Sequence, residues 1–139
     1  MISIRTRLLL GALLCAAVAI ASPFFAAGGS QPVDVIAHGQ HINVKQHLVH
    51  GKVTILDFYA DWCGPCRKIA PWLEQLPKND SQIVLRKVDI VNWQSPVAKQ
   101  FNLDGIPHVQ VYNGKGQLVG EVSGVDPEAV QQFIAKAKM

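Results

Sequence analysis

The sequence predicts an α/β domain in which a mixed central β-sheet is flanked by helices on both faces. Three observations predict this fold class. Segments with strand character alternate with segments of helical spacing in the first part of the domain. The strand-like run at residues 53–59 is apolar on both faces, as expected of a buried central strand. A hairpin pattern followed by a helix closes the chain, so we expect parallel and antiparallel strands in one sheet.

The N-terminus has the pattern of a secretory signal peptide. Arg5 and Arg7 precede an unbroken apolar run at residues 8–20, and a small-residue exit site follows it. We therefore expect residues 1–21 to be a cleaved signal peptide and the domain to lie in the periplasm or another extracytoplasmic space. One alternative is an uncleaved anchor reaching to about residue 27, because 20 apolar residues are roughly enough to span a bilayer. A buried core helix is the other alternative, although a position at the extreme N-terminus argues against it.

Removal of the leader leaves 118 residues, which is enough for one domain with a modest core. We expect residues 28–32 to form a short tether and residues 33–139 to form the folded domain. The leader takes two arginines with it, which leaves 11 basic residues against 10 acidic ones. A net charge of about +1 gives no reason to expect a nucleic-acid partner, and we expect a monomer.

The segment before the central strand predicts a hairpin and one helical turn. Short strands at 33–36 and 41–44 would flank a turn at 37–40. Residues 45–50 would form a single helical turn that Gly51 closes.

After the central strand, helix and strand patterns alternate to the end of the chain. We expect a helix at 63–76, which Pro71 should kink and which ends at 77–80. A strong strand follows at 83–90. The remaining expected elements are a short helix at 96–101, a hairpin of strands 109–112 and 117–123, and a last helix capped by Asp126 with Pro127 in its first turn.

Cys63 and Cys66 lie where the central strand passes into the following helix, and they are the candidate reaction centre. At the helix N-terminus, free N–H groups and the helix dipole favour a thiolate on Cys63. A thiol with a pKa of about 8.5 is ~3% ionised at pH 7, whereas a pKa near ~7 makes it about half ionised. Cys66 lies one turn deeper on the same helical face, so it can attack a mixed disulfide formed at Cys63.

The number of cysteines favours redox chemistry over other uses of the pair. Cys15 lies in the leader, so only Cys63 and Cys66 remain in the exported domain. A disulfide scaffold needs more cysteines, and a zinc site commonly needs a second pair. Half of a zinc site and two inert core thiols are the alternatives. We expect no cofactor other than a redox-active Cys63–Cys66 disulfide, and no metal.

Asp57 lies in the middle of the central strand, between two apolar residues. Burial of a carboxylate is costly and should raise its pKa, so Asp57 is a candidate acceptor for the Cys66 proton. A strand residue that reaches solvent at the end of the sheet is the alternative. Lys87, in the adjacent expected strand, could pair with Asp57 or be an ordinary exposed lysine.

Residues 57–68, which read Asp-Phe-Tyr-Ala-Asp-Trp-Cys-Gly-Pro-Cys-Arg-Lys, closely resemble the active-site segment of thioredoxin. Pro71 matches the proline that kinks the active-site helix of that family, and residues 105–107 match the segment with its cis-proline. Asn113-Gly114 and Gly124 fit its closing hairpin. The resemblance runs from about residue 53 to the C-terminus and implies the thioredoxin fold.

The resemblance also implies roles for individual residues. Cys63 would attack and Cys66 would resolve, with Asp57 as the buried carboxylate and Lys87 as its neighbour. Pro107 would be cis and lie against the cysteines, where it would discourage metal binding. The backbone of Ile106 would pair with an extended substrate segment. Four further residues would line the groove: Trp62, Gly64, Pro65 and Gly124.

Two departures from the family pattern stand out. His108 occupies the place where thioredoxin usually has threonine, and its imidazole could alter thiolate stability or substrate choice. The segment at 39–44, leading to Gly51-Lys52, is similar to exported, membrane-tethered thioredoxin-like reductases of bacteria. Those proteins usually carry an insertion after the active-site helix, and none fits between Leu76 and Ile83.

The sequence therefore predicts an exported thiol–disulfide oxidoreductase that reduces protein disulfides in the cell envelope. Gly-Pro between the cysteines resembles the reducing members of the family. A reductase in an oxidising compartment needs a membrane protein as its electron donor. One alternative is a metal-handling module for copper or cytochrome assembly that uses His38, His41, His47 and His50 with the cysteines. A redox-silent interaction domain is the other.

Overall fold

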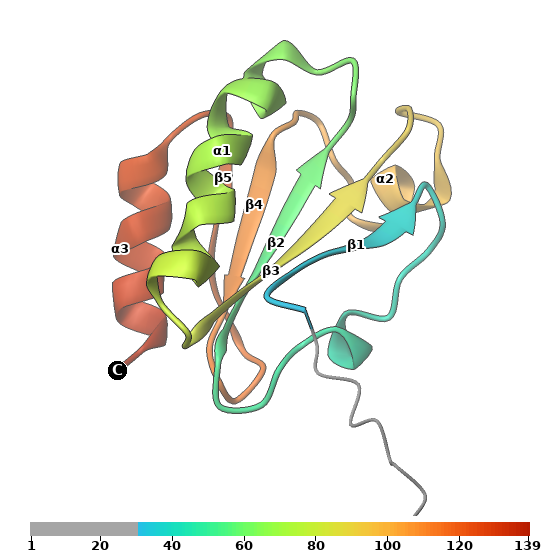
Figure 1. Ribbon diagram of the computed structural model, residues 1–139. Coiled ribbons are helices and arrows are strands. Elements are labelled where there is room, and N and C mark those ends of the chain that lie inside the picture. The colour runs from blue at the N-terminus through green and yellow to red at the C-terminus, as the bar shows by residue number, and fades with distance from the viewer. Residues whose placement is uncertain (1–30) are drawn as a thin grey trace, which may run out of the picture.

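The structure, a computed structural model, describes residues 31–139, which form one five-stranded sheet with helices on both faces (Figure 1). In chain order the elements are β1 (Val33–His38), the short 3-10 helix η1 (Val44–Gln46), β2 (Val53–Tyr59), α1 (Gly64–Asn79), β3 (Ile83–Asp89), α2 (Pro96–Gln100), β4 (His108–Tyr112), β5 (Leu118–Ser123) and α3 (Pro127–Ala137).

The sheet is mixed, with strand order β1-β3-β2-β4-β5. Strands β1, β3 and β2 are parallel, whereas β4 runs antiparallel to β2 and β5 antiparallel to β4. β2 therefore lies at the centre and is paired on both sides, which explains why its residues are apolar on both faces. The predicted fold class is confirmed.

The two faces of β2 contribute to two separate parts of the core. Ile55 packs in the cluster that includes α1 and α3, which lie side by side on one face of the sheet (Figure 1). Leu56 and Phe58 pack in the cluster that includes α2 on the other face. The alternation places Asp57, the residue between them, on the α1 side.

The hairpin predicted before the central strand is wrong. β1 extends to His38 and pairs with β3 in parallel, and residues 41–43 form no strand. Gly39 turns the chain with a φ of +83°, and its N–H donates to the Asp89 carbonyl at 2.8 Å. The side chain of Gln100 then bonds both backbone groups of Ile42, at 2.9 and 2.7 Å, so this segment needs no strand partner.

Two helix boundaries also differ from the prediction. The single turn expected at 45–50 is a 3-10 turn at Val44–Gln46, because the Asn43 side chain caps it by accepting the Lys45 N–H. α1 continues to Asn79, although Pro77 was expected to end it. Pro77 removes only one backbone N–H from the helical hydrogen bonds. The Asp80 N–H still donates to the Leu76 carbonyl at 3.0 Å, so the helical pattern continues past the proline.

The predicted signal peptide at 1–21, its alternative as an anchor to about residue 27, and most of the tether at 28–32 lie outside the described residues. Within residues 31–139, no helix has both the length and the apolar character needed to cross a bilayer.

Gly120 of β5 packs closely against helix α3. A Cβ atom at this position would overlap the ring of Phe133 on α3. Gly120→Val should therefore lower the free energy of unfolding by about 1–3 kcal/mol, as other overpacking substitutions do. Urea unfolding measures the change. Gly105→Ala is the control, because a Cβ there meets no atom within 4 Å; equal losses in the two variants would contradict this packing.

Candidate functional site

The two cysteines lie at the carboxyl end of β2, where the chain turns into α1. Cys63 is the N-cap residue of α1, and its own N–H donates to the Ala60 carbonyl at 3.0 Å. Pro65 follows in the first turn, where a residue without an N–H is tolerated. The end of a buried strand and the start of a helix thus hold Cys63 in place.

Cys63 and Cys66 form a disulfide, with their Cα atoms 5.3 Å apart. Both are buried, so exposure does not distinguish their roles. Their positions distinguish the two cysteines, because the Cys66 N–H donates to the Cys63 sulfur at 3.1 Å. This donor and the start of the helix both favour negative charge on the sulfur of Cys63 when the pair is reduced.

Asp57 is buried on the α1 side of β2, with 2% of its surface exposed. Its Oδ1 atom has no hydrogen-bond partner among the described residues. Burial raises the pKa of this carboxyl to about 7, while the charge of Lys87 lowers the pKa and that of Glu74 raises it. A carboxyl with this pKa can accept and release a proton near neutral pH, as the predicted role requires.

Lys87 lies opposite Asp57 in the register of β2 and β3, but its ammonium group pairs with another acid. Its Nζ atom is 2.7 Å from Oε1 of Glu74 on α1 and 4.7 Å from the centre of the Tyr59 ring. Within residues 31–139, Asp57 and Lys87 therefore form no direct ion pair of the kind considered from the sequence, and Lys87 is no ordinary exposed lysine. It acts on Asp57 through its charge.

Glu74 is a residue that the sequence analysis missed. It lies four residues after Ala70 and eight after Cys66, which places all three on one stripe of α1. The eight-residue spacing was the available signal. It places the acid about two turns after the resolving cysteine on the same side of the helix, and hence toward the same neighbouring strand.

A small cavity of about 150 Å³ reaches this stripe from the surface, with Cys66, Ala70, Tyr59 and Lys87 in its wall. It is large enough to admit water. Water in this cavity would contact both Cys66 and the charged side chain of Lys87.

The loop before β4 forms the other side of the cysteine pair. The peptide bond between Ile106 and Pro107 is cis, as the resemblance implies. The Ile106 carbonyl oxygen lies 3.7 Å from the Cys63 sulfur, and the Pro107 carbonyl accepts the N–H of Gly124 at 2.7 Å. The fold thus brings three of the predicted site residues together beside Cys63, although they are more than 40 positions away in sequence.

His108 is engaged with β5. Its Nδ1 atom is 2.9 Å from Oγ of Ser123, and its Nε2 atom is 3.3 Å from a carboxylate oxygen of Glu121. Both ring nitrogens are therefore held by the neighbouring strand. Substrate binding by His108, and by the groove residues Trp62, Gly64 and Pro65, stays a prediction.

Val91 and Trp93, in the loop after β3, are two further residues that the sequence analysis missed. The Trp62 indole Nε1 donates to the Val91 carbonyl at 2.7 Å, and the Trp62 and Trp93 rings are 5.9 Å apart. The available signal was a tryptophan between Asn92 and Gln94, in a polar stretch with no strand or helix to bury it.

The four histidines do not assemble a metal centre within residues 31–139, where no group of three or more His, Cys, Asp or Glu side chains is placed to hold an ion. His38 lies 3.4 Å from a carboxylate oxygen of Asp89, and His41 is 3.1 Å from the side-chain oxygen of Gln100. These two side chains thus have partners other than the cysteines.

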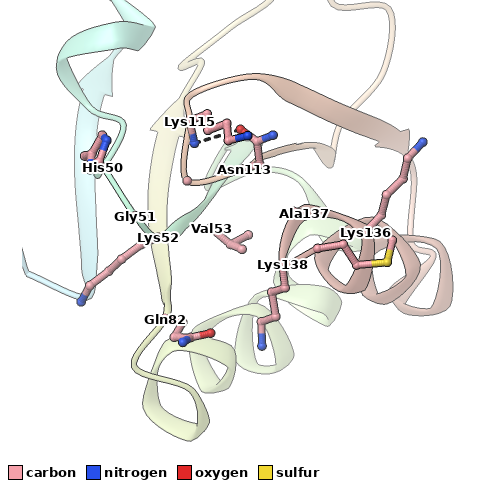
Figure 2. A pocket seen from close by; sticks show the side chains of 12 residues that line it. His50, Gly51, Lys52, Val53, Gln82, Asn113, Lys115, Lys136, Ala137 and Lys138 are labelled. Carbon is pink, nitrogen blue, oxygen red and sulfur yellow. Dashed lines mark hydrogen bonds between the residues drawn. The ribbon is translucent and has the colours of Figure 1, made fainter.

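A larger hollow of about 480 Å³ lies at the opposite end of the sheet, where β2 begins (Figure 2). Lys52, Asn113 and Lys138 are among the residues around it, and they come from the segment before β2, the β4–β5 turn and the end of α3. Since the cysteines lie beyond the other end of β2, this hollow is not part of the redox site.

The class of protein follows from this geometry. A Cys-x-x-Cys disulfide at a helix N-terminus, with a buried carboxyl under the helix and a cis-proline beside the sulfur, defines a thiol–disulfide oxidoreductase.

Comparison with known proteins gives the family. The thioredoxin family model matches residues 35–136. The chain is 37% identical over 89 residues to a thioredoxin of Coprinus comatus, covering 63% of this chain and 82% of that protein. It is 40% identical over 78 residues to a thioredoxin of Streptomyces clavuligerus, covering 56% and 71%. Spinach chloroplast thioredoxin f superposes with a TM-score of 0.63 at 26% identity, covering 77% of this chain and 94% of that one. The chain belongs to the thioredoxin family.

The raised pKa of Asp57 predicts how stability depends on pH. The pKa of its carboxyl is about 7 in the folded protein, against an ordinary value of 3.8 for an aspartate in the unfolded chain. Between these values the unfolded chain has lost the proton and the folded protein keeps it, so folded stability falls as pH rises from about 4 to about 7. The loss amounts to about 4 kcal/mol.

Asp57→Asn should remove this pH dependence. The stability of the variant relative to wild type should rise by about 4 kcal/mol between pH 4 and pH 8. Urea unfolding of the oxidised proteins across this range measures it, since the disulfide then has no thiols to titrate. Asp104→Asn, at an exposed acid, is the control. If the difference in unfolding free energy between wild type and Asp57→Asn did not change with pH, the Asp57 carboxyl would have the same pKa in the folded and unfolded states, contrary to this prediction.

Proposed function

We propose that this chain is an exported thioredoxin that reduces disulfide bonds of proteins in the cell envelope. The observation that carries the thiol–disulfide exchange is the position of Cys63, whose sulfur accepts the Cys66 N–H at 3.1 Å at the start of α1. A stabilised thiolate is present at neutral pH and can attack disulfides. The expected direction, reduction of the client, rests on the Gly-Pro dipeptide between the cysteines, which resembles the reducing members of the family.

The reaction would proceed in two exchanges. The Cys63 thiolate attacks one sulfur of the client disulfide, so that a Cys63–client bond forms, the client disulfide breaks and one client thiolate leaves. Cys66 then gives its proton to the Asp57 carboxylate and attacks the Cys63 sulfur. The Cys63–Cys66 disulfide forms and the second client thiolate leaves. The client gains two electrons, and this protein loses them.

The case for export rests on the leader pattern at residues 1–21 and on the similarity of residues 39–44 to tethered bacterial reductases. In an oxidising compartment the Cys63–Cys66 disulfide must be reduced again after each turnover. We therefore propose a membrane protein as the electron donor. Such a donor would pass two electrons to the disulfide from the other side of the membrane.

A trapping experiment tests both the clients and the compartment. Cys66→Ser in the full-length chain removes the resolving thiol, so mixed disulfides at Cys63 should accumulate and should be found with envelope proteins by mass spectrometry. Cys63→Ser is the matched control and should trap none. Clients confined to the cytoplasm would contradict export, and the absence of any trapped client would contradict the protein-reductase function.

The equilibrium potential of the Cys63–Cys66 couple tests the direction of the reaction. Equilibration with glutathione should give a value closer to the ~-270 mV of thioredoxin than to the ~-120 mV of strong oxidants. The two values correspond to a difference of about 7 kcal/mol, so the measurement separates them easily. A potential at the oxidising end would make the protein an oxidant of its clients.

A further inference from the structure

We propose that Trp93 extends the client-binding surface beside Cys63 and selects client segments with a large apolar side chain next to the reacting cysteine. This inference rests on the proposed function, because it concerns the polypeptide that exchanges disulfides with Cys63. Trp62, Val91 and Trp93 together are called the tryptophan ledge below.

The ledge is a cluster of exposed apolar groups. Trp62 is 52% exposed, Val91 45% and Trp93 40%, and the indole rings of the two tryptophans are 5.9 Å apart. Single exposed apolar side chains are common on protein surfaces, whereas adjoining ones mark interaction sites. The four other large apolar side chains exposed in residues 31–139 are Val35, Leu118, Val125 and Met139.

The ledge is held in one arrangement by its backbone. The Val91 N–H donates to Oδ1 of Asp89 at 2.8 Å, and the Asn92 N–H donates to the Ile90 carbonyl at 2.6 Å. Val91 has a φ of +61° in this tight turn. A β-branched residue rarely adopts a positive φ, and strained residues of this kind concentrate at functional sites. In this strained turn the Val91 carbonyl accepts the indole N–H of Trp62.

The first strand also supports this turn. Gly39 follows β1, and a Cβ atom there would lie 3.3 Å from Cγ2 of Val91, closer than most real contacts. The absence of a side chain at Gly39 thus lets the end of β1 pack against the turn. A surface that is fixed before binding loses less conformational entropy when a client docks.

The ledge adjoins Cys63, the residue that would form the mixed disulfide with a client. Trp62 directly precedes Cys63, and the Ile106 carbonyl lies 3.7 Å from the Cys63 sulfur on the other side. A polypeptide joined to Cys63 by a mixed disulfide therefore has its neighbouring residues close to Trp62. Rigid aromatic side chains at such central positions contribute strongly to binding.

The surroundings of the ledge favour an apolar side chain as its occupant. Val91 adds an exposed aliphatic side chain to the ledge, and a cation would gain nothing from contact with it. Val91 also borders an open hollow of about 460 Å³, whose polar lining residues include Gln40, Asn92 and Gln94. An apolar centre with a polar rim is the usual composition of a protein-binding surface.

Matched peptide disulfides test the proposal. Three peptides would differ only in the residue next to the reacting cysteine, which is Leu, Ser or Lys, and kcat/KM for their reduction by the dithiothreitol-reduced protein would be measured. Wild type should prefer Leu over Ser by about tenfold, as partial burial of one leucine allows. Trp93→Ala should reduce this ratio to about twofold or less, and Trp93→Phe should keep most of it.

Leu118→Ala is the control, because Leu118 is 49% exposed but begins β5 at the end of the sheet away from the cysteines. It should leave the Leu-to-Ser ratio as in wild type. Each ratio is taken within one variant, so a change in redox potential or in the amount of folded protein cancels.

Three results would overturn the proposal. One is an equal Leu-to-Ser ratio in wild type and Trp93→Ala, and another is a wild-type preference for the Lys peptide, which would indicate binding of a cation to the rings. The third is reduction of all three peptides by the wild type at similar rates. Failure of the wild-type protein to reduce any of the three peptides would count against the proposed function as well. Reduction of all three at similar rates would overturn only the role of Trp93.

Discussion

The redox site depends on the hydrogen bond from the Cys66 N–H to the Cys63 sulfur at the start of α1. This bond requires Cys63 to cap the helix, and the cap requires β2 to end a few residues before it. β2 can deliver the cysteine because it is paired on both sides and buried on both faces. A change that loosens β2 would therefore move the sulfur away from the groups that favour its negative charge.

The buried charges between β2, β3 and α1 form a second layer of the same site. Asp57 is buried without a partner for one oxygen, while the nearby Lys87 is turned toward Glu74. A direct ion pair with Lys87 would hold Asp57 ionised, and a carboxylate held in this way would be a poor proton acceptor. The pairing of Lys87 with Glu74 leaves Asp57 able to take up a proton near neutral pH.

The surfaces that a client would contact lie at the same end of the sheet as the cysteines. The parallel strands β1, β2 and β3 all end there, and β4 begins there after the cis-proline. The Ile106–Pro107 segment and the tryptophan ledge consequently lie on two sides of one sulfur atom. Loops at the carboxyl ends of parallel strands are the usual place for binding residues in α/β proteins, because the sheet fixes them in a common position.

The sequence by itself determined the features that depend on near neighbours. Periodicity was sufficient for β2 and for most of α1. The Cys63–Cys66 pair, read together with the resemblance of residues 57–68 to thioredoxin, predicted the reaction class. Only the tertiary structure decided what depends on distant partners. β1 takes β3 as its partner across about 50 residues, Lys87 takes Glu74 instead of Asp57, and the Val91 carbonyl meets the indole of Trp62. Local propensity carries no information on such contacts, because they form only when the sheet and the helix have packed.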